Sequence, residues 1–158
     1  MISILGDHKP YKFPDKTPLD KCVADILEDE VDEKYYLSKE VGHIQIDLPC
    51  IAASRGRNPE NPSDRTPGAP TEQRLEINTK GTSNTITTVQ KDNYVVETTY
   101  RIRKLTPREC FRLMGMRDDD IDKIRAAGIS NTQQYKMAGN SIVVNVLEEI
   151  FKNLFMEG

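Results

Sequence analysis

The stretch "RKLTPRECFRLMGM", residues 103–116, marks the point at which the chain changes from strand-forming to helix-forming sequence. Thr106 is followed by Pro107, and Glu109 lies three residues after Thr106. This is the pattern of a capping box with proline at the first helical position. It predicts a helix that begins at Pro107 and ends at Gly115, because glycine favours the left-handed conformation at a helix end.

Two later stretches carry the same kinds of start and stop signal. The first, "DDDIDKIRAAG", has acidic residues in its first turn and Gly128 at its end. The second, "SNTQQYKMAG", begins with Ser130 as a cap, places Gln133 three residues on and reaches Gly139. Acidic side chains favour the positive end of a helix, and glycine favours its termination. Both stretches are predicted to be helices, and Gly139 is predicted to end the second.

Residues 142–155 are predicted to form the last helix. Their apolar positions recur at helical spacing, which indicates one buried face. Glu148 and Lys152 are spaced to pair on the opposite face. Asn140 or Ser141 is expected to cap the start of this helix. The apolar face consists of Ile142, Val143, Val146, Leu147, Ile150, Phe151 and Leu154.

The N-terminal residues contain shorter signals. Met1–Leu5 has the pattern of a short buried strand, and residues 7–18 hold three prolines, which indicates an extended connector. Residues 20–28 have apolar positions at helical spacing and predict a short acidic helix.

The middle of the chain is predicted to combine a loop with short strands. Residues 54–72 hold four prolines and two glycines, which predicts a long irregular loop. Alternating residues over 74–97 predict two or three short strands, with turns at Gly81 and Asn93. Residues 98–104 are predicted to form a further strand.

Composition narrows the class of protein. The 158 residues are 37% hydrophobic and 6% aromatic, which is typical of a polar, loop-rich globular chain. No window approaches the roughly 18 apolar residues that a membrane span needs, so no membrane partner is expected. The three cysteines are far apart and form no metal-binding pattern, which favours a reducing cytoplasm.

Charge is distributed unevenly along the sequence. Residues 51–108 carry 10 Lys/Arg and 6 Asp/Glu, a net of +4, in a chain whose net charge is −3. Such a basic middle is consistent either with a solvated loop surface or with a segment that faces phosphates.

No complete active site can be assembled from these residues. His8 and His43 are isolated, and their interpretation as surface or turn residues is favoured over a role as ligand or base. Cys50 follows a proline, and a small buried cysteine is favoured there over a nucleophile. No Gly-rich phosphate loop, serine triad or metal constellation is present in the sequence.

Two C-terminal stretches together carry a family resemblance. Residues 103–116 and "QYKMAGNSIVVNVLEEIF", residues 134–151, resemble motifs IX and X of the DNA cytosine-5 methyltransferases. Residues 23–38 resemble the segment that leads into the target recognition domain of bacterial and phage members. "SNTITTVQKDN", residues 83–93, resembles the Thr-Leu signature of that domain, with Ile86 in place of Leu. The resemblance covers essentially the whole chain.

The resemblance implies an α+β fold. An irregular small-sheet target recognition domain would be followed by a helical segment that, in the full enzyme, packs on a Rossmann-like methyltransferase sheet. Residues 1–38 would be the end strand of the catalytic domain and a connector. Residues 39–102 would form the recognition domain, and residues 103–158 would return to the catalytic domain through motifs IX and X.

Four other motifs of the family are not found in the sequence. These are the Phe-x-Gly-x-Gly loop, the Pro-Cys-Gln nucleophile motif, Glu-Asn-Val and Gln-x-Arg-x-Arg. Pro49-Cys50 is followed by Ile51 and stands in the wrong place in the motif order. The resemblance therefore implies the C-terminal third of such an enzyme, whether as an expressed fragment, a truncated gene product or a subunit of a split enzyme.

The resemblance also implies a division of labour. The family transfers methyl from S-adenosylmethionine to C5 of a flipped-out cytosine, using a cysteine that adds to C6 and an acid near N3. This chain supplies neither group and is expected to be inactive alone. It is expected to recognise double-stranded DNA in a specific sequence, as in restriction-modification systems. The alternative is a DNA-binding subunit of a split methyltransferase, and an unrelated scaffold protein is the least favoured interpretation.

Site residues follow from the resemblance position by position. The stretch around Thr85 and Ile86 would face the major groove, with Thr85 and Thr88 near the target nucleotide's backbone. Asn140, Ser141 and Ile142 would lie beside S-adenosylmethionine. Arg108 and Glu109 would be scaffold. For the three arginines expected at phosphates a solvated loop charge is the alternative, and for Thr85–Thr88 it is ordinary β-propensity. The expected base readers are Gln90, Lys91, Asn93 and Arg74, and the expected phosphate contacts are Arg55, Arg57 and Arg65.

The apolar face of the last helix also needs a partner. In a complete enzyme the N-terminal catalytic portion would cover it. Without that portion, residues 105–127, Met1–Leu5 or a second copy of the chain are expected to cover it, since exposed apolar area favours self-association.

Overall fold

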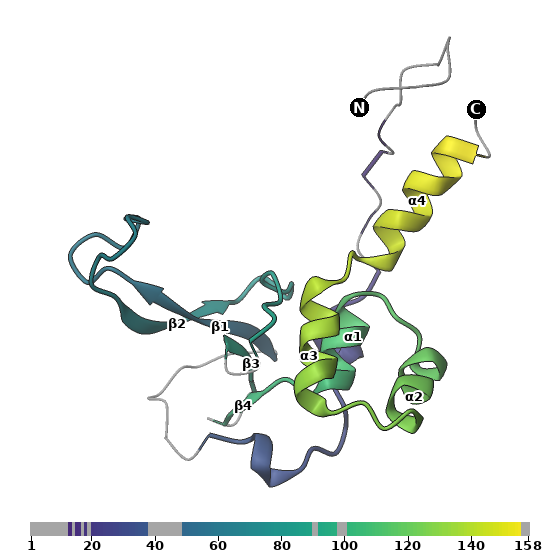
Figure 1. The fold of residues 1–158 in the computed structure, drawn as a ribbon, viewed down its shortest axis with the longest axis horizontal. Helices are drawn as coiled ribbons and strands as arrows, with labels where there is room; N and C mark the ends of the chain where they lie inside the picture. Colours follow the sequence, from purple (N-terminus) through teal and green to yellow (C-terminus); the bar gives the residue numbers. More distant parts are fainter. Residues whose placement is uncertain are drawn as a thin grey trace.

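The computed structural model describes residues 13, 15–16, 18, 20–37, 49–89, 92–97 and 101–155. Within these ranges the fold is α+β: an open antiparallel sheet lies beside a group of helices, and the last helix extends away from both (Figure 1). The predicted strand at Met1–Leu5 lies outside the described residues. In chain order the elements are η1 (Val23–Ile26), η2 (Glu33–Tyr35), β1 (Cys50–Arg57), β2 (Glu72–Asn78), β3 (Asn93–Val96), β4 (Ile102–Lys104), α1 (Pro107–Leu113), α2 (Asp118–Ala126), α3 (Asn131–Asn140) and α4 (Val144–Phe155).

The sheet has the strand order β2-β1-β3-β4. Only the first half of β1, Cys50–Ala53, pairs with β3, whereas Ile51–Arg57 pairs with β2. The outer half of β1 and its partner β2 therefore form a hairpin that projects beyond the rest of the sheet (Figure 1).

The prediction of a loop from residue 54 onward was wrong for Ser54–Arg57, which are strand. Serine, glycine and arginine have little intrinsic strand preference, but β2 supplies a hydrogen-bonding partner along their whole length. The predicted strands within 74–97 and the turn at Gly81, which has φ +71°, are confirmed. The predicted turn at Asn93 was wrong, because Asn93 begins β3 and pairs with Ala53.

The two faces of the sheet belong to two separate apolar clusters. Ile51 pairs with Val95, and both pack against the buried side chains of α1 and α3, which include Phe111 and Tyr135. The next position along β1, Ala52, faces the other way and packs with Tyr94. This alternation follows from the two-residue period of a strand, so every odd-numbered β1 residue lies on the helix side.

The start signals predicted for α1 and α3 are confirmed. The Thr106 hydroxyl accepts a hydrogen bond from the Glu109 amide, and the Glu109 side chain accepts one from the Thr106 amide. The Ser130 hydroxyl accepts from the Gln133 amide. The glycine ends of α1 and α2 are also confirmed, since Gly115 and Gly128 have φ values of +79° and +72°.

Two other helix boundaries were predicted wrongly. Helix α3 continues through Gly139 to Asn140 and ends at Ser141, whose hydroxyl donates to the Ala138 carbonyl. Helix α4 then begins only at Val144, so neither Asn140 nor Ser141 caps it. A glycine is a poor guide to a helix end when something other than termination requires it.

The predicted helix over residues 20–28 is a single 3-10 turn, η1. The backbone becomes extended again at Leu27 (ψ 151°), and the Glu28 amide donates to the distant Glu109 carboxylate instead of continuing a helix. Tertiary contacts therefore override the helical spacing of Val23 and Ile26, both of which are nevertheless buried.

Helix α4 is anchored at its start and exposed along its length. The Val144 amide donates to the Met114 carbonyl at 2.9 Å, but no α4 residue is buried, and Val146 and Phe151 are each 51% exposed. Residues 105–127 were expected as one possible cover of this apolar face, but they do not cover it (Figure 1). Lys152 forms an ion pair with Glu149. None of the described helices has the length and apolar character needed to cross a membrane.

Because Cys50 and Cys110 are buried, we expect the free energy of unfolding to fall at high pH. Burial, and secondarily the Glu109 charge, raises the pKa of Cys110 from 9.0 to about 12, and burial raises the pKa of Cys50. The stabilising effect is therefore complete below pH 9 and is lost as pH rises towards 12, because only the unfolded thiol ionises in that window. Cys110 alone should cost about 1 kcal/mol between pH 9 and 10. Urea unfolding at pH 8, 9 and 10 measures this loss of stability. Cys110→Ala should make the free energy of unfolding fall less steeply with pH. The control, Cys22→Ser at an exposed site, should leave the pH dependence unchanged.

Candidate nucleic-acid interface

Three arginines gather on the helix side of the projecting hairpin. Arg55 and Arg57 are odd-numbered β1 residues and therefore share the face of Ile51. Arg74 lies directly opposite Arg55 across the β1–β2 pair. Like charges at directly opposed positions repel one another, so this pair is unfavourable without an anion nearby. We call these three arginines the arginine face.

Glu76 supplies part of the missing negative charge within the protein. It forms an ion pair and hydrogen bond with Arg57, and its carboxylate lies 3.4 Å from the Arg55 guanidinium. The bond from Arg57 holds the pKa of Glu76 below its usual value. One carboxylate is thus shared between two arginines, while Arg74 makes a long 3.5 Å hydrogen bond to the Pro59 carbonyl.

The fourth predicted arginine lies elsewhere. Arg65 donates to the carbonyls of Pro62 and Asp64 within its own loop, at 2.7 and 3.0 Å. The structure therefore brings Arg55, Arg57 and Arg74 together and leaves Arg65 as an exposed loop residue that stabilises its own turn.

Residues 84–89, which we call the threonine loop, connect the hairpin to β3. Ile86 is partly buried against the helix-side cluster, and Thr85 is exposed. The loop therefore lies on the same side of the sheet as the arginine face. Gln90 and Lys91, two of the predicted base readers, lie outside the described residues.

Asn93 is built into the support of this loop. Its side chain is buried, its Oδ1 accepts from the Thr87 amide at 3.1 Å, and its Nδ2 donates to the Thr87 carbonyl at 3.0 Å. A second, longer bond reaches the Val89 carbonyl. The predicted base reader is thus engaged on both amide atoms with the backbone of the threonine loop, an arrangement that fixes the loop's position.

The three predicted cofactor residues lie at and just after the end of α3. Asn140, Ser141 and Ile142 are all exposed, and Ile142 is 59% so. Asn140 is the last residue of α3, and Ser141 and Ile142 lie between α3 and the start of α4 at Val144. What they offer is an amide, a hydroxyl and an apolar side chain in sequence. That combination fits one side of a ligand with polar and apolar parts, such as a nucleoside.

A cavity of about 730 Å³ lies beside this segment and was not predicted. It is lined by η1, by the turn at Gly81, by the end of α1 and by Val143 and Asn145. Its walls come from four separate parts of the sequence, so no local pattern reveals it. Among the residues that the structure describes, no group of His, Cys, Asp or Glu is arranged to hold a metal ion.

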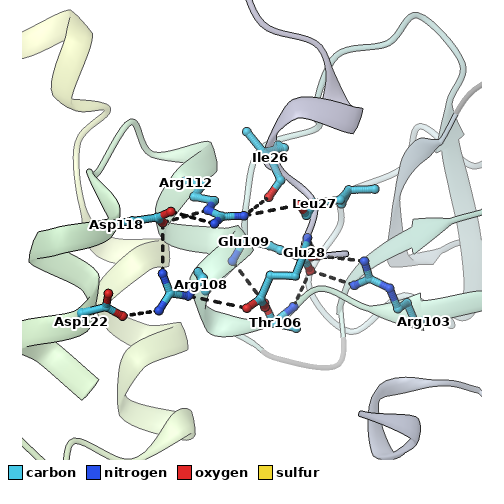
Figure 2. A network of polar contacts seen from close by, with 10 residues as sticks. All are labelled: Ile26, Leu27, Glu28, Arg103, Thr106, Arg108, Glu109, Arg112, Asp118 and Asp122. Atoms are coloured by element: carbon cyan, nitrogen blue, oxygen red, sulfur yellow. Dashed lines mark hydrogen bonds and ion pairs between the residues drawn. The ribbon is translucent and has the colours of Figure 1, made fainter. Parts of the chain in front are cut away.

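A buried polar network joins the sheet to the helices (Figure 2). Each carboxylate oxygen of Glu109 accepts two hydrogen bonds. Oε1 accepts from Arg103 and the Glu28 amide, and Oε2 accepts from Arg103 and the Thr106 amide. Arg103 and Glu109 are 1% and 0% exposed as side chains. Ion pairing with Glu109 and Glu97 outweighs the effect of burial and raises the pKa of Arg103.

The same network ties the N-terminal connector to α1 and α2. Arg108 pairs with Glu28, Asp118 and Asp122, while Arg112 pairs with Asp118 (Figure 2). Arg112 also donates to the Ile26 and Leu27 carbonyls. The side chains of Arg108 and Glu109 are therefore engaged with the connector, β4 and α2, an arrangement that suits the scaffold role expected for them.

Comparison with known proteins relates this chain to DNA-modifying enzymes. It matches the C-5 cytosine-specific DNA methylase family model over residues 5–156. It is 33% identical to the orphan methyltransferase M.SPBetaI of Bacillus phage SPbeta over 197 residues, covering 91% of this chain and 44% of that protein. It is 34% identical to the type II methyltransferase M2.ScrFI of Lactococcus lactis subsp. cremoris over 158 residues, covering 98% and 39% respectively.

A shorter stretch shows a stronger similarity. Over 55 residues, 35% of this chain and 12% of the relative, it is 66% identical to the orphan methyltransferase M.SPRI of Bacillus phage SPR. The chain spans less than half the length of the relatives it matches. Because the family model covers nearly all of its sequence, the chain belongs to the C-5 cytosine-specific DNA methylase family.

Proposed function

We propose that this chain is the target-recognition part of a DNA cytosine-5 methyltransferase and contributes one wall of its S-adenosylmethionine site. The observation that carries the proposal is the strand register, which gathers Arg55, Arg57 and Arg74 on the face of the sheet where the threonine loop also lies. Cations position a protein on DNA phosphates, and neighbouring polar groups reach base edges.

Each part of this surface has a role in the proposal. The arginine face contacts phosphates, with Arg74 able to reach a base edge because its hydrogen bond to the Pro59 carbonyl is long and weak. Thr85 and Thr88 contact the backbone at the target nucleotide. Gln90 and Lys91 read bases, while Asn93 acts indirectly by holding the loop. Such a surface suits a restriction-modification methyltransferase that acts at one sequence.

S-adenosylmethionine, the methyl donor implied by the family, would contact Asn140, Ser141 and Ile142. When bound it supplies the methyl group. The role of these three residues is to bind it from one side, by the Asn140 amide and the Ile142 side chain, both exposed. The other walls belong to a catalytic portion that carries the Pro-Cys-Gln and Glu-Asn-Val motifs, which the sequence of this chain does not contain.

The exposed face of α4 supports the need for that portion. Val146, Phe151 and Phe155 are each more than half exposed, which is an unusual concentration of apolar surface for one helix. The catalytic portion, in the same polypeptide or as a separate chain, covers this face in the proposal. A second copy of this chain is the alternative cover, and a split enzyme remains the alternative form of the whole protein.

The proposal predicts that the chain transfers no methyl group alone. Incubation with labelled S-adenosylmethionine and mixed-sequence duplex DNA should leave the DNA unlabelled, because no nucleophilic cysteine motif is present. A full-length methyltransferase of the family serves as the positive control. DNA labelling by the purified chain would show that the catalytic group lies within these residues and would overturn the proposed division of labour.

A further inference from the structure

Gly139 lies in contact with the backbone of the threonine loop. A Cβ atom placed on Gly139 would come within 2.6 Å of the Thr88 amide nitrogen, 2.7 Å of its Cα and 2.8 Å of the Thr87 carbonyl carbon. Contacts closer than 3.0 Å to a Cβ essentially do not occur in proteins. All three atoms are main chain, so no side-chain rotation can relieve the overlap.

The conformation of α3 does not itself require glycine at this position. Gly139 lies inside the helix and is not among the residues with positive φ. Helices favour alanine over glycine, because glycine loses more conformational freedom on folding. The close approach of the loop is therefore the physical reason for glycine here, and it also explains why this glycine does not end the helix.

The threonine loop is fixed from two other directions. Asn93 brackets Thr87 from the sheet, with bonds to both its amide and its carbonyl. Ile86 packs into the helix-side cluster. Gly139 provides the third boundary, on the helix, one residue before Asn140. The backbone contact at Gly139 therefore sets how closely the threonine loop approaches the start of the Asn140–Ile142 segment.

We propose that Gly139 is a positioning residue, which sets the place of Thr85 and Thr88 relative to the Asn140–Ile142 segment. This inference rests on the proposed function for its consequence in DNA binding. Its structural part stands on the contact alone. A side chain at residue 139 pushes the threonine loop away from α3 and misplaces its two hydroxyls with respect to the DNA.

Gly139→Ala tests this inference, with Lys136→Ala as the matched control at an exposed position of the same helix. Amide hydrogen exchange should accelerate about tenfold in residues 85–89 of Gly139→Ala, while the amides of α1 and α2 keep their wild-type rates. At low salt its dissociation constant for duplex DNA should rise about tenfold, equivalent to about 1.4 kcal/mol. The slope of affinity against salt should be unchanged, since no phosphate contact is removed.

Separate outcomes distinguish the two proposals. Wild-type exchange rates over residues 85–89 in Gly139→Ala would overturn the positioning role. Absence of DNA binding by the wild-type chain would overturn the proposed function, and the exchange rates would still decide the role of Gly139. If Gly139→Ala does not fold, the wild-type chain provides the test: a nuclear Overhauser effect between the Gly139 Hα protons and the Thr88 amide is expected, and its absence would overturn the inference.

Discussion

Glu109→Gln is expected to lower the free energy of unfolding by about 3 to 5 kcal/mol, the usual cost of breaking a buried ion pair on one side. The glutamine amide would point donor hydrogens at Arg103 and at backbone amides that now donate to the carboxylate. The positive charge of Arg103, almost completely buried, would keep Glu97 as its one carboxylate partner among the described residues. For a small domain this is a large part of the total stability.

Urea unfolding followed by circular dichroism measures this loss. The control is Arg101→Ala, which removes an exposed ion pair to Glu33 and should cost about 1 kcal/mol or less. A cost for Glu109→Gln as small as that of the control would mean that Glu109 does not organise the junction between β4, α1 and the connector.

Replacing Arg55, Arg57 and Arg74 together with alanine is expected to weaken duplex DNA binding by about 100-fold at low salt. Each phosphate that an arginine neutralises releases condensed counterions, so the slope of log affinity against log salt should become shallower by about 0.9 for each such arginine removed. Fluorescence anisotropy with labelled duplex DNA over a salt series gives both quantities. Glu76→Gln should act in the opposite direction, because it frees Arg55 and Arg57 from a competing carboxylate.

A charge-matched variant distinguishes the loss of the arginine face from the loss of the same net charge elsewhere on the protein. Lys34, Lys123 and Arg125 are exposed cations away from the hairpin, and their joint replacement with alanine removes the same charge. This control should retain most of the affinity and most of the salt slope. Equal reductions in the two triple variants would show that DNA binding does not use the arginine face.

Local signals in the sequence predicted the helical half of the fold well. The capping box at Thr106 and Glu109 and the glycine ends at Gly115 and Gly128 are decided by hydrogen bonds and φ values within a few residues. Such interactions are the same in any tertiary context. They therefore appear directly in the order of residue types.

Features set by distant partners could not be predicted in this way. The outer half of β1 is a strand because β2 pairs with it, and Gly139 is a glycine because Thr88 approaches it. The resemblance placed Asn93 among the base readers, whereas its burial depends on the loop that folds over it. In each case the deciding neighbour lies in another part of the chain, and no pattern within the local window contains it.

DNA recognition through the sheet can be tested by amide hydrogen exchange of the wild-type chain, with and without duplex DNA at low salt. If the chain binds DNA in this way, DNA should slow exchange at Arg55–Arg57 and over residues 85–89, and leave α2, with its three acidic residues in the first turn, unaffected. Protection of α2 or α4 alone, with unchanged exchange in the hairpin and the threonine loop, would show that DNA is bound elsewhere and not by this sheet.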